Sequence, residues 1–404
     1  MFIILTMRKI SVKTCLVIIV FSALFSNFAH PITPTLFKSL GFHDYMFGTA
    51  FAAMSFTNFL FSPFWGSIMR KLGTAKMMAL CYLGYAIAQV GFGLADSEFM
   101  MIMVRLFSGI FIGGFNVGQI MYIMDNSDEA HRSKNLVYCA TINTIMAAFG
   151  YMLGGILGDI SIYYSIIAQV LGLVMVAIAI YVLLADRPKE RRELEFSDII
   201  KASNPFKAFI NSKEFINNII LCFLLMCIFA QFATTAYDQA FNYFIKDQFG
   251  FPPSYNGVLK ALVGFVSLFA NMTICQYLLK KTNIFKSLIY VFGICVSMLI
   301  AIIVVQDVLI FILINIVFFA FNAVYQPLIQ ASMSSFEGVD NSVIVGLYNA
   351  VKSLGMVSGS LLAGFIYELG PRIPFVLSAI SFLGAIILVS RLYKHFKRHT
   401  NPMV

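Results

Sequence analysis

The sequence Leu40-Gly41-Phe42, followed by Gly48, returns later in the chain as Phe249-Gly250-Phe251, followed by Gly257. The spacing between the tripeptide and the later glycine is the same in both places, so the two stretches align residue by residue. Each stretch lies between two long apolar segments. We therefore interpret the chain as two copies of one design, and this duplication determines the fold that we expect.

A second pair of matching motifs lies in the fourth and tenth apolar segments. Phe115-Asn116 is matched by Phe321-Asn322, and a glutamine follows in each copy, Gln119 and Gln326. Two membrane halves with a shared ancestry are typical of transporters that bind a solute between the halves. The repeat therefore favours a function in moving a solute across a bilayer.

The composition predicts an all-α membrane protein. Of the 404 residues, 60% are hydrophobic, and the mean hydropathy is +0.85, far above the values of soluble domains. A membrane-spanning helix takes about 20 residues, so the chain has room for about twelve of them. We expect a six-helix half in residues 1–185, a cytoplasmic linker in 186–215 and a second six-helix half in 216–404, related by pseudo-two-fold symmetry. The apolar runs place the spans near 12–36, 46–69, 77–95, 99–124, 136–158, 162–185, 216–241, 255–279, 287–305, 308–334, 342–367 and 375–390.

The basic residues predict the orientation in the membrane. With both termini cytoplasmic, 22 of the 28 Lys and Arg residues fall in inner segments, and only Lys38, Lys246 and Arg372 fall outside. Such an excess of basic residues is characteristic of cytoplasmic loops. The formal charge of +9 then describes loops that face anionic lipid, so we expect no nucleic-acid partner. We expect a multi-pass protein of the cell membrane that functions as a monomer.

Several functions are disfavoured by what the sequence lacks. It contains no nucleotide-binding P-loop, so transport would be driven by an ion or solute gradient. Its seven cysteines form no CxxC motif and have no ligand-like spacing with histidine, so we expect neither disulfides nor a metal site or cofactor. The apolar N-terminal run is interpreted as the first helix and not as a signal peptide, because further spans follow it.

Charged side chains inside the predicted spans are the first candidates for function, because burying a charge in a bilayer is costly. They are Asp238, Arg105, Lys260 and Lys352. Asp238 is either the proton-coupling carboxylate, a structural partner of Lys260, or a solvated residue near the interface. Three cations against one acid favour an anionic or zwitterionic solute over a purely cationic one.

Arg105 and Lys352 each allow two interpretations. Arg105 has a functional role or simply bonds to backbone carbonyls. Lys352 either binds an anionic group or loses its proton on desolvation, which makes it a second coupling candidate, or it lies near the loop of a shorter helix. Polar residues in apolar spans add candidates for a substrate cavity or for hydrogen bonds between helices. With Lys260, these are His30, Asn116, Gln119, Asn322, Tyr325 and Gln326.

Four motifs in matching order resemble those of the major facilitator superfamily, in particular its twelve-span drug:proton antiporters. They are Gly66-Ser-Ile-Met-Arg70-Lys71-Leu-Gly73 after the second span; Arg105 with Gly109, Gly113 and Asp125 in the fourth; Gly150, Gly154, Gly155 and Gly158 in the fifth; and Gly355 and Gly359 in the eleventh. The resemblance implies proton-coupled export by alternating access. It also implies a proton-relay or switching role for Arg105.

Two departures from the family pattern affect the predicted mechanism. Arg70 stands where the family has an aspartate. We predict that it pairs with Asp340 or Glu337 and latches the outward-open state with reversed polarity; alternatively it faces lipid headgroups. Gly155 stands where the antiporter motif has a proline, which weakens the inference of export. Glycines four residues apart line one helix face, so we expect tight helix packing there rather than substrate contact.

The leading prediction is proton-coupled efflux of small amphiphilic compounds. The main alternative is uptake or export of an anionic metabolite through Arg105, Lys260 and Lys352. A membrane-embedded lipid enzyme is disfavoured because His30 is the only histidine in a span and no Ser/His/Asp group occurs with it. A non-transporting sensor is disfavoured because no soluble signalling domain is present.

Overall fold

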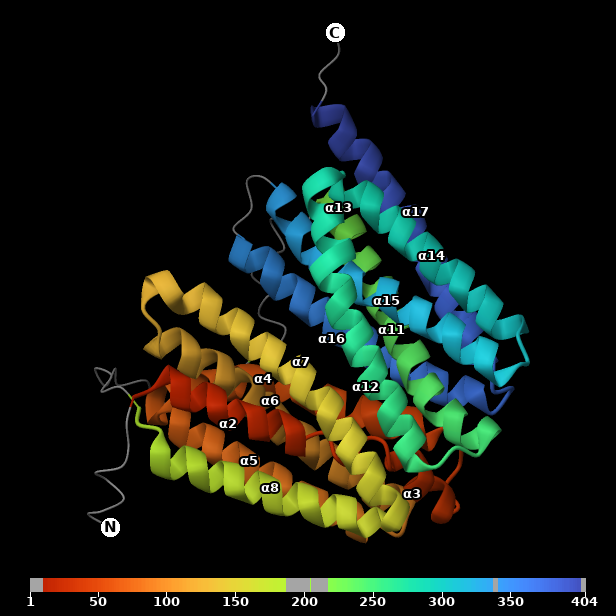
Figure 1. Cartoon of the computed structure of the whole chain (residues 1–404). Coiled ribbons are helices and arrows are strands. Elements are labelled where there is room, and N and C mark those ends of the chain that lie inside the picture. Colours follow the sequence, from red (N-terminus) through yellow and green to blue (C-terminus); the bar gives the residue numbers. More distant parts are fainter. Residues whose placement is uncertain (1–9, 187–203, 205–216, 337–340, 401–404) are drawn as a thin grey trace. The chain divides into compact units, whose positions relative to one another are not determined.

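The computed structural model describes residues 10–186, 204, 217–336 and 341–400. The regular elements in this part of the chain are helices, in agreement with the predicted all-α fold (Figure 1). The predicted cytoplasmic linker 186–215 lies outside the described residues, apart from Asp186 and Asn204, and so do the acids Glu337 and Asp340. The domain boundaries at 185 and 216 stay a prediction.

The helices follow the predicted spans closely, and their bounds are as follows. The earlier ones are α2 Val12–Phe25, α3 Thr33–Ser39, α4 Met46–Leu72, α5 Thr74–Leu94, α6 Glu98–Asn126, α7 Glu129–Ile160 and α8 Ile162–Leu183. The later ones are α11 Asn218–Phe249, α12 Pro253–Ala270, α13 Gln276–Lys281, α14 Ile284–Val304, α15 Val308–Ser332, α16 Asn341–Tyr367 and α17 Ile373–Thr400. A π-helical turn, Asn271–Cys275, joins α12 to α13.

Ten of these helical segments are long and apolar enough to cross a membrane, and Val12–Phe25 is a shorter apolar helix. The first predicted span, 12–36, is not continuous: α2 ends at Phe25, and α3 starts at Thr33 after a series of turns. Pro31 and Pro34 lack the backbone N–H that a continuous helix needs at these positions, which explains the break.

The chain divides into two compact units. Unit 1 contains Met1–His43, Ala53–Pro205 and Gly250–Leu262, and unit 2 contains Asp44–Ala52, Phe206–Phe249 and Val263–Val404. The first residues of α4 thus belong to unit 2, although the rest of that helix belongs to unit 1. The first residues of α12 belong in the same way to unit 1.

Equivalent helices pair in the same way inside each unit. In unit 1, α2 packs against α7 and α8, while α5 packs against α6 and α8. In unit 2, α11 packs against α16 and α17, while α14 packs against α15 and α17. The repeat in the sequence therefore corresponds to a repeated packing arrangement.

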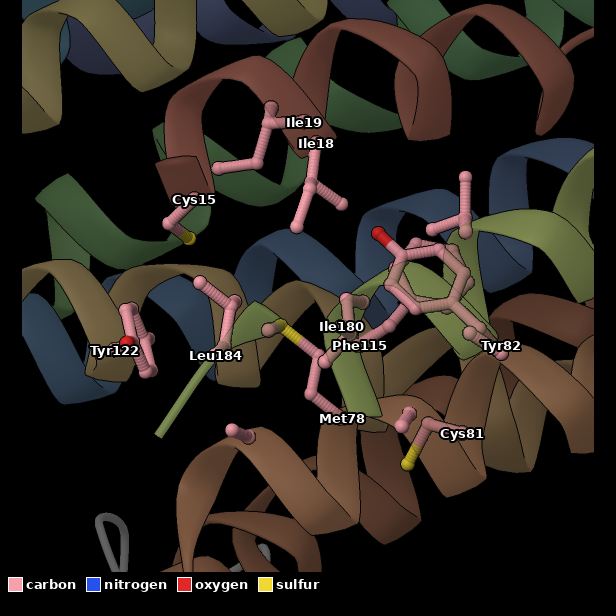
Figure 2. Close-up of a cluster of buried hydrophobic side chains, with 14 of the residues drawn as sticks. Cys15, Ile18, Ile19, Met78, Cys81, Tyr82, Phe115, Tyr122, Ile180 and Leu184 are labelled. Carbon is pink, nitrogen blue, oxygen red and sulfur yellow. The ribbon is translucent and has the colours of Figure 1, made fainter. Parts of the chain in front are cut away.

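The core of unit 1 lies where α2, α5, α6 and α8 meet (Figure 2). The rings of Tyr82 and Phe115 stack with their centroids 4.6 Å apart, and Met78 and Ile180 are buried in the same cluster. Tyr82 carries its hydroxyl into this core, so the hydroxyl needs a hydrogen-bond partner there. The partner is Gln119, the glutamine that follows Phe115-Asn116 in the repeat.

Candidate substrate-translocation site

Gln119 is the centre of a buried hydrogen-bond network in unit 1. Its Nε2 donates to the hydroxyl of Tyr82 at 2.6 Å and to Oγ of Ser22 at 3.2 Å, and its Oε1 accepts from Nδ2 of Asn143 at 3.0 Å. These partners come from α5, α2 and α7, so one amide on α6 joins four helices. Its donor and acceptor atoms are both engaged by the protein.

Gln326, Tyr325 and Lys352 come together in unit 2 around a residue of α11 that the sequence analysis missed. Oε1 of Gln231 accepts from the Tyr325 hydroxyl at 3.3 Å and from Nε2 of Gln326 at 3.5 Å. Nζ of Lys352 donates to Oε1 of Gln326 at 3.5 Å. Gln231 is seven residues before Asp238 on the same helix, so a search for polar residues two turns from the acid would have found it.

Asn116 and Asn322 are equivalent in the repeat but differ in their surroundings. Asn322 is buried, and its Oδ1 accepts a hydrogen bond of 2.9 Å from Thr234 on α11. The side chain of Asn116 is exposed on α6. Asn322 is thus part of the polar face between α11 and α15, whereas Asn116 is not part of the Gln119 network.

Arg105 is buried in α6, and none of the described residues places an acid beside it. Its side chain is 5% exposed, and its guanidinium lies 4.0 Å from the centre of the Phe92 ring. Nη1 approaches Sδ of Met54 at 4.0 Å, and Nε has no hydrogen-bond partner among the described residues. The alternative in which Arg105 bonds to backbone carbonyls is therefore not what this part of the structure shows.

Asp238, Lys260 and His30 occupy half-buried positions. Asp238 lies inside α11, eleven residues before its last residue, which places it about 16 Å from that helix end. His30 lies in the turn after α2 and stacks on Tyr151 of α7, with ring centroids 5.3 Å apart. Asp238 belongs to unit 2 and Lys260 to unit 1, so their pairing stays a prediction.

The predicted glycines of α7 and α16 lie against neighbouring backbones. A Cβ on Gly150 would meet the Leu24 carbonyl of α2, and one on Gly154 would meet the Phe28 carbonyl. On α16, a Cβ on Gly355 would meet the Ile228 carbonyl of α11. One on Gly359 would meet the Phe232 carbonyl of the same helix. In both units these helices approach so closely that no side chain fits between them.

Gly155 faces the first residues of α12, and Gly158 lies between these residues and Ile32, which continues the series of Leu24 and Phe28. A Cβ on Gly155 would come within 2.5 Å of the Pro253 carbonyl, and one on Gly158 would meet Ile32 and Pro253. A Cβ on Gly257 of α12 would meet the Tyr151 carbonyl of α7 in return. The glycines thus form a second close contact within unit 1.

Asp186, which is not part of the Gly66–Gly73 motif, contacts the loop between α4 and α5. Gly73 has φ of 102°, a conformation that favours glycine, and a Cβ there would lie 2.5 Å from Oδ2 of Asp186. The other carboxylate oxygen accepts a hydrogen bond of 2.7 Å from the backbone N–H of Ala75. Asp186 thereby caps the start of α5 from far away in the sequence.

The other residues of this motif make local contacts. Nη2 of Arg70 donates to Oγ of Ser67 at 3.4 Å, one turn earlier, and Lys71 is exposed. Gly66 has an open position, because a Cβ there would have only Val117 within 4 Å. The predicted pair between Arg70 and Asp340 or Glu337 stays a prediction.

Comparison with known proteins agrees with this architecture. The profile of the Major Facilitator Superfamily matches residues 15–338. Multidrug resistance protein 2 of Bacillus subtilis (strain 168) is 22% identical over 362 residues, which cover 89% of this chain and 88% of the relative. Quinolone resistance protein NorA of Staphylococcus aureus (strain COL) is 23% identical over 371 residues, 89% of this chain and 90% of the relative.

Solved structures show the same fold at lower identity. The nucleoside transporter NupG is similar with a TM-score of 0.72 at 14% identity, covering 96% of this chain and 99% of that one. The human organic anion transporter MFSD10 (TETRAN) is similar with a TM-score of 0.66 at 16% identity, covering 94% and 98%.

The helical fold and its repeated polar sites define a membrane transporter and not an enzyme. The chain belongs to the Major Facilitator Superfamily, whose profile covers most of its length. It is a multi-pass membrane protein that moves small molecules across the bilayer.

Proposed function

We propose that this transporter exports small amphiphilic compounds from the cell in exchange for protons. The observation that carries the proposal is the position of Asp238, a half-buried acid inside α11 and inside the predicted span 216–241. An ionisable group within a membrane span is costly and marks a site of ion or proton movement. The names of the relatives support export of drug-like compounds in particular.

The polar face of α11 gives a route by which protonation affects the bound compound. Thr234, one turn before Asp238, donates to Asn322, and Gln231, two turns before it, holds Tyr325 and Gln326. A compound bound along this face would be released outward when Asp238 takes up a proton. It would be bound again after the proton has left toward the cytoplasm.

Alternating access requires two halves that change partners while their helices stay intact. We assign these halves to residues 1–185 and 216–404, with the linker and both termini on the cytoplasmic side, as the distribution of basic residues favours. The close contacts at Gly154 and Gly359 support rigid movement, because each joins two helices of one half without intervening side chains. The pairing of Arg70 with Asp340 would lock one of the two states.

The test is compound-driven proton movement in proteoliposomes that enclose a pH-sensitive dye. The panel contains a lipophilic cation, a quinolone and an organic anion without a cationic group. With the wild-type protein, we expect the first two to drive proton movement, and an imposed pH gradient to drive their accumulation. If only the organic anion drives proton movement, the protein is an anion transporter and the proposal is wrong.

Asp238→Asn tests the role of the acid, with Asp307→Asn as the matched control. Asp307 caps α15 by accepting from the Ile310 N–H at 2.9 Å, and asparagine caps equally well. We expect Asp238→Asn to bind compounds with an affinity within a few-fold of wild type and to lose accumulation against a gradient. The control Asp307→Asn should behave as wild type. Normal accumulation by Asp238→Asn would remove this carboxylate from the coupling step.

A further inference from the structure

Lys352 lies deep in α16 at a point where that helix meets α11. It is eleven residues after Asn341, about 16 Å along the helix, and three residues before Gly355. A Cβ on Gly355 would come within 3.0 Å of Cβ of Gln231, so Lys352 lies about one turn from a close contact between the two helices. From this depth a lysine side chain does not reach the helix end by extending along it.

The ammonium group of Lys352 is poorly satisfied by the protein. Within the described residues its Nζ makes one hydrogen bond, to Oε1 of Gln326, and the N···O distance of 3.5 Å is at the limit for such a bond. An ammonium group has three donors, and Lys352 has no carboxylate partner among the described residues. A cation at this depth with one weak neutral partner has donors left for an anionic ligand.

The polar side chains beside Lys352 also make long hydrogen bonds. Tyr325 and Gln326 both donate to Oε1 of Gln231, at 3.3 and 3.5 Å, and Nε2 of Gln326 also lies 3.4 Å from the Tyr325 hydroxyl. These bonds are longer than the usual 2.7–3.2 Å range, so exchanging them for bonds to a ligand costs little. The described partners of Gln119 in unit 1, Ser22, Tyr82 and Asn143, include no cation, although Gln119 occupies the equivalent place in the repeat.

We propose that Lys352 and Gln326 bind a carboxylate of the exported compound, so that the substrates include amphiphilic zwitterions. The carboxylate would accept from Nζ of Lys352 and from Nε2 of Gln326, which a rotation of the amide frees from Gln231. A carboxylate supplies the charge-assisted bonds that a neutral ester of the same size cannot match. This inference rests on the proposed function, since it names the substrate class for that export site.

The test compares two dyes that differ at one group: rhodamine B, which has a free carboxylate and is a zwitterion, and its ethyl ester, which is a cation. Fluorescence anisotropy measures their binding to the purified protein at neutral pH. The variants are Lys352→Gln, which removes the charge, and Lys352→Arg, which keeps it. Lys280→Gln is the control, because Lys280 is exposed at the end of α13.

We expect Lys352→Gln to weaken binding of rhodamine B at least tenfold and to change binding of the ester less than twofold. Lys352→Arg should retain most of the affinity for rhodamine B, and Lys280→Gln should bind both dyes as wild type does. The inference is overturned if Lys352→Gln affects both dyes equally, affects neither, or if the wild-type protein does not bind rhodamine B.

Proteoliposome transport of the same dyes separates this inference from the proposed function. If rhodamine B binds in a manner that depends on Lys352 but is not moved against a gradient, the carboxylate site stands and proton-coupled export fails. If the ester is exported and rhodamine B is neither bound nor exported, export stands and the carboxylate site fails.

Discussion

The hydroxyl of Tyr243 donates a hydrogen bond of 2.5 Å to Oδ1 of Asp44, a residue 199 positions away in the sequence. Beside it, the Tyr367 hydroxyl donates to Oδ2 of Asp247 at 2.8 Å, and the two tyrosine rings meet edge to face. These contacts join the chain just before α4 to α11 and α16 within unit 2. Phe47 stacks on the Tyr243 ring and completes the cluster.

We expect Tyr243→Phe to destabilise the protein by about 1–3 kcal/mol, because the substitution removes a hydrogen bond to a charged acceptor. The loss should be visible as a lower midpoint of thermal unfolding in detergent. Tyr290→Phe is the control, since Tyr290 is 60% exposed and its ring contact with Lys286 is kept by phenylalanine. Equal midpoints for the two variants would show that the Tyr243–Asp44 bond contributes no stability.

Gly154→Ala is expected to cost about 1–3 kcal/mol, the usual penalty for forcing a methyl group into a packed contact. The new Cβ would meet the carbonyl and Cα of Phe28, which are backbone atoms and cannot rotate away. Gly293→Ala on α14 provides the comparison, because no atom lies within 4 Å of its Cβ position and alanine favours the helix. We expect the midpoint of thermal unfolding to fall for Gly154→Ala and to rise for Gly293→Ala. An unchanged midpoint for Gly154→Ala would contradict the close packing at this position.

Arg105 and Arg372 should respond in opposite ways to substitution by methionine. Arg372 donates to the Ile303 carbonyl at 2.7 Å, so its loss should lower stability. Arg105 has neither such a backbone bond nor an acid partner in the described part of the chain, so removing this buried cation should leave stability unchanged or raise it. We expect Arg105→Met nevertheless to lose most of its transport activity, since costly groups in a membrane core are kept for function. A strongly destabilised Arg105→Met with normal transport per folded molecule would assign Arg105 a structural role.

Gln119→Leu should separate the two interpretations of the polar residues on α6. Because protein groups use both the donor and the acceptor of this amide, we expect Gln119 to link helices rather than to bind solute. Stability should fall by about 1–3 kcal/mol, while the KM for transport changes less than threefold. The exposed Gln276 offers the control variant Gln276→Leu. A large rise in KM at unchanged stability would instead indicate direct solute contact.

Much of the fold followed from local properties of the sequence. Length and hydropathy placed the helices, because each membrane helix must satisfy its own backbone and present about 20 apolar residues. The first span was predicted wrongly as continuous, since Pro31 and Pro34 were not weighed against the apolar run that contains them. The repeat correctly predicted that the two copies would pack alike, because equivalent sequences have equivalent apolar faces.

The candidate site was predictable only in part. Gln119, Tyr325, Gln326 and Lys352 were singled out as polar or charged residues in apolar spans, and the structure places the last three together. Gln231 and Asp186 were missed, since their roles depend on helices or loops that are distant in the sequence. Asn116 was included because it repeats Asn322, but only Asn322 faces a partner helix.

The sequence by itself determined the all-α fold, its duplication and the positions where charge enters the membrane, because hydropathy and charge are properties of single residues and short segments. Only the tertiary structure decided which charge has a partner. Among the described residues, Arg372 donates to backbone carbonyls, Arg105 lies on an aromatic ring, and Lys352 has one weak bond to an amide. The physical reason is that a partner comes from another helix, and the packing of the whole unit determines which helix that is.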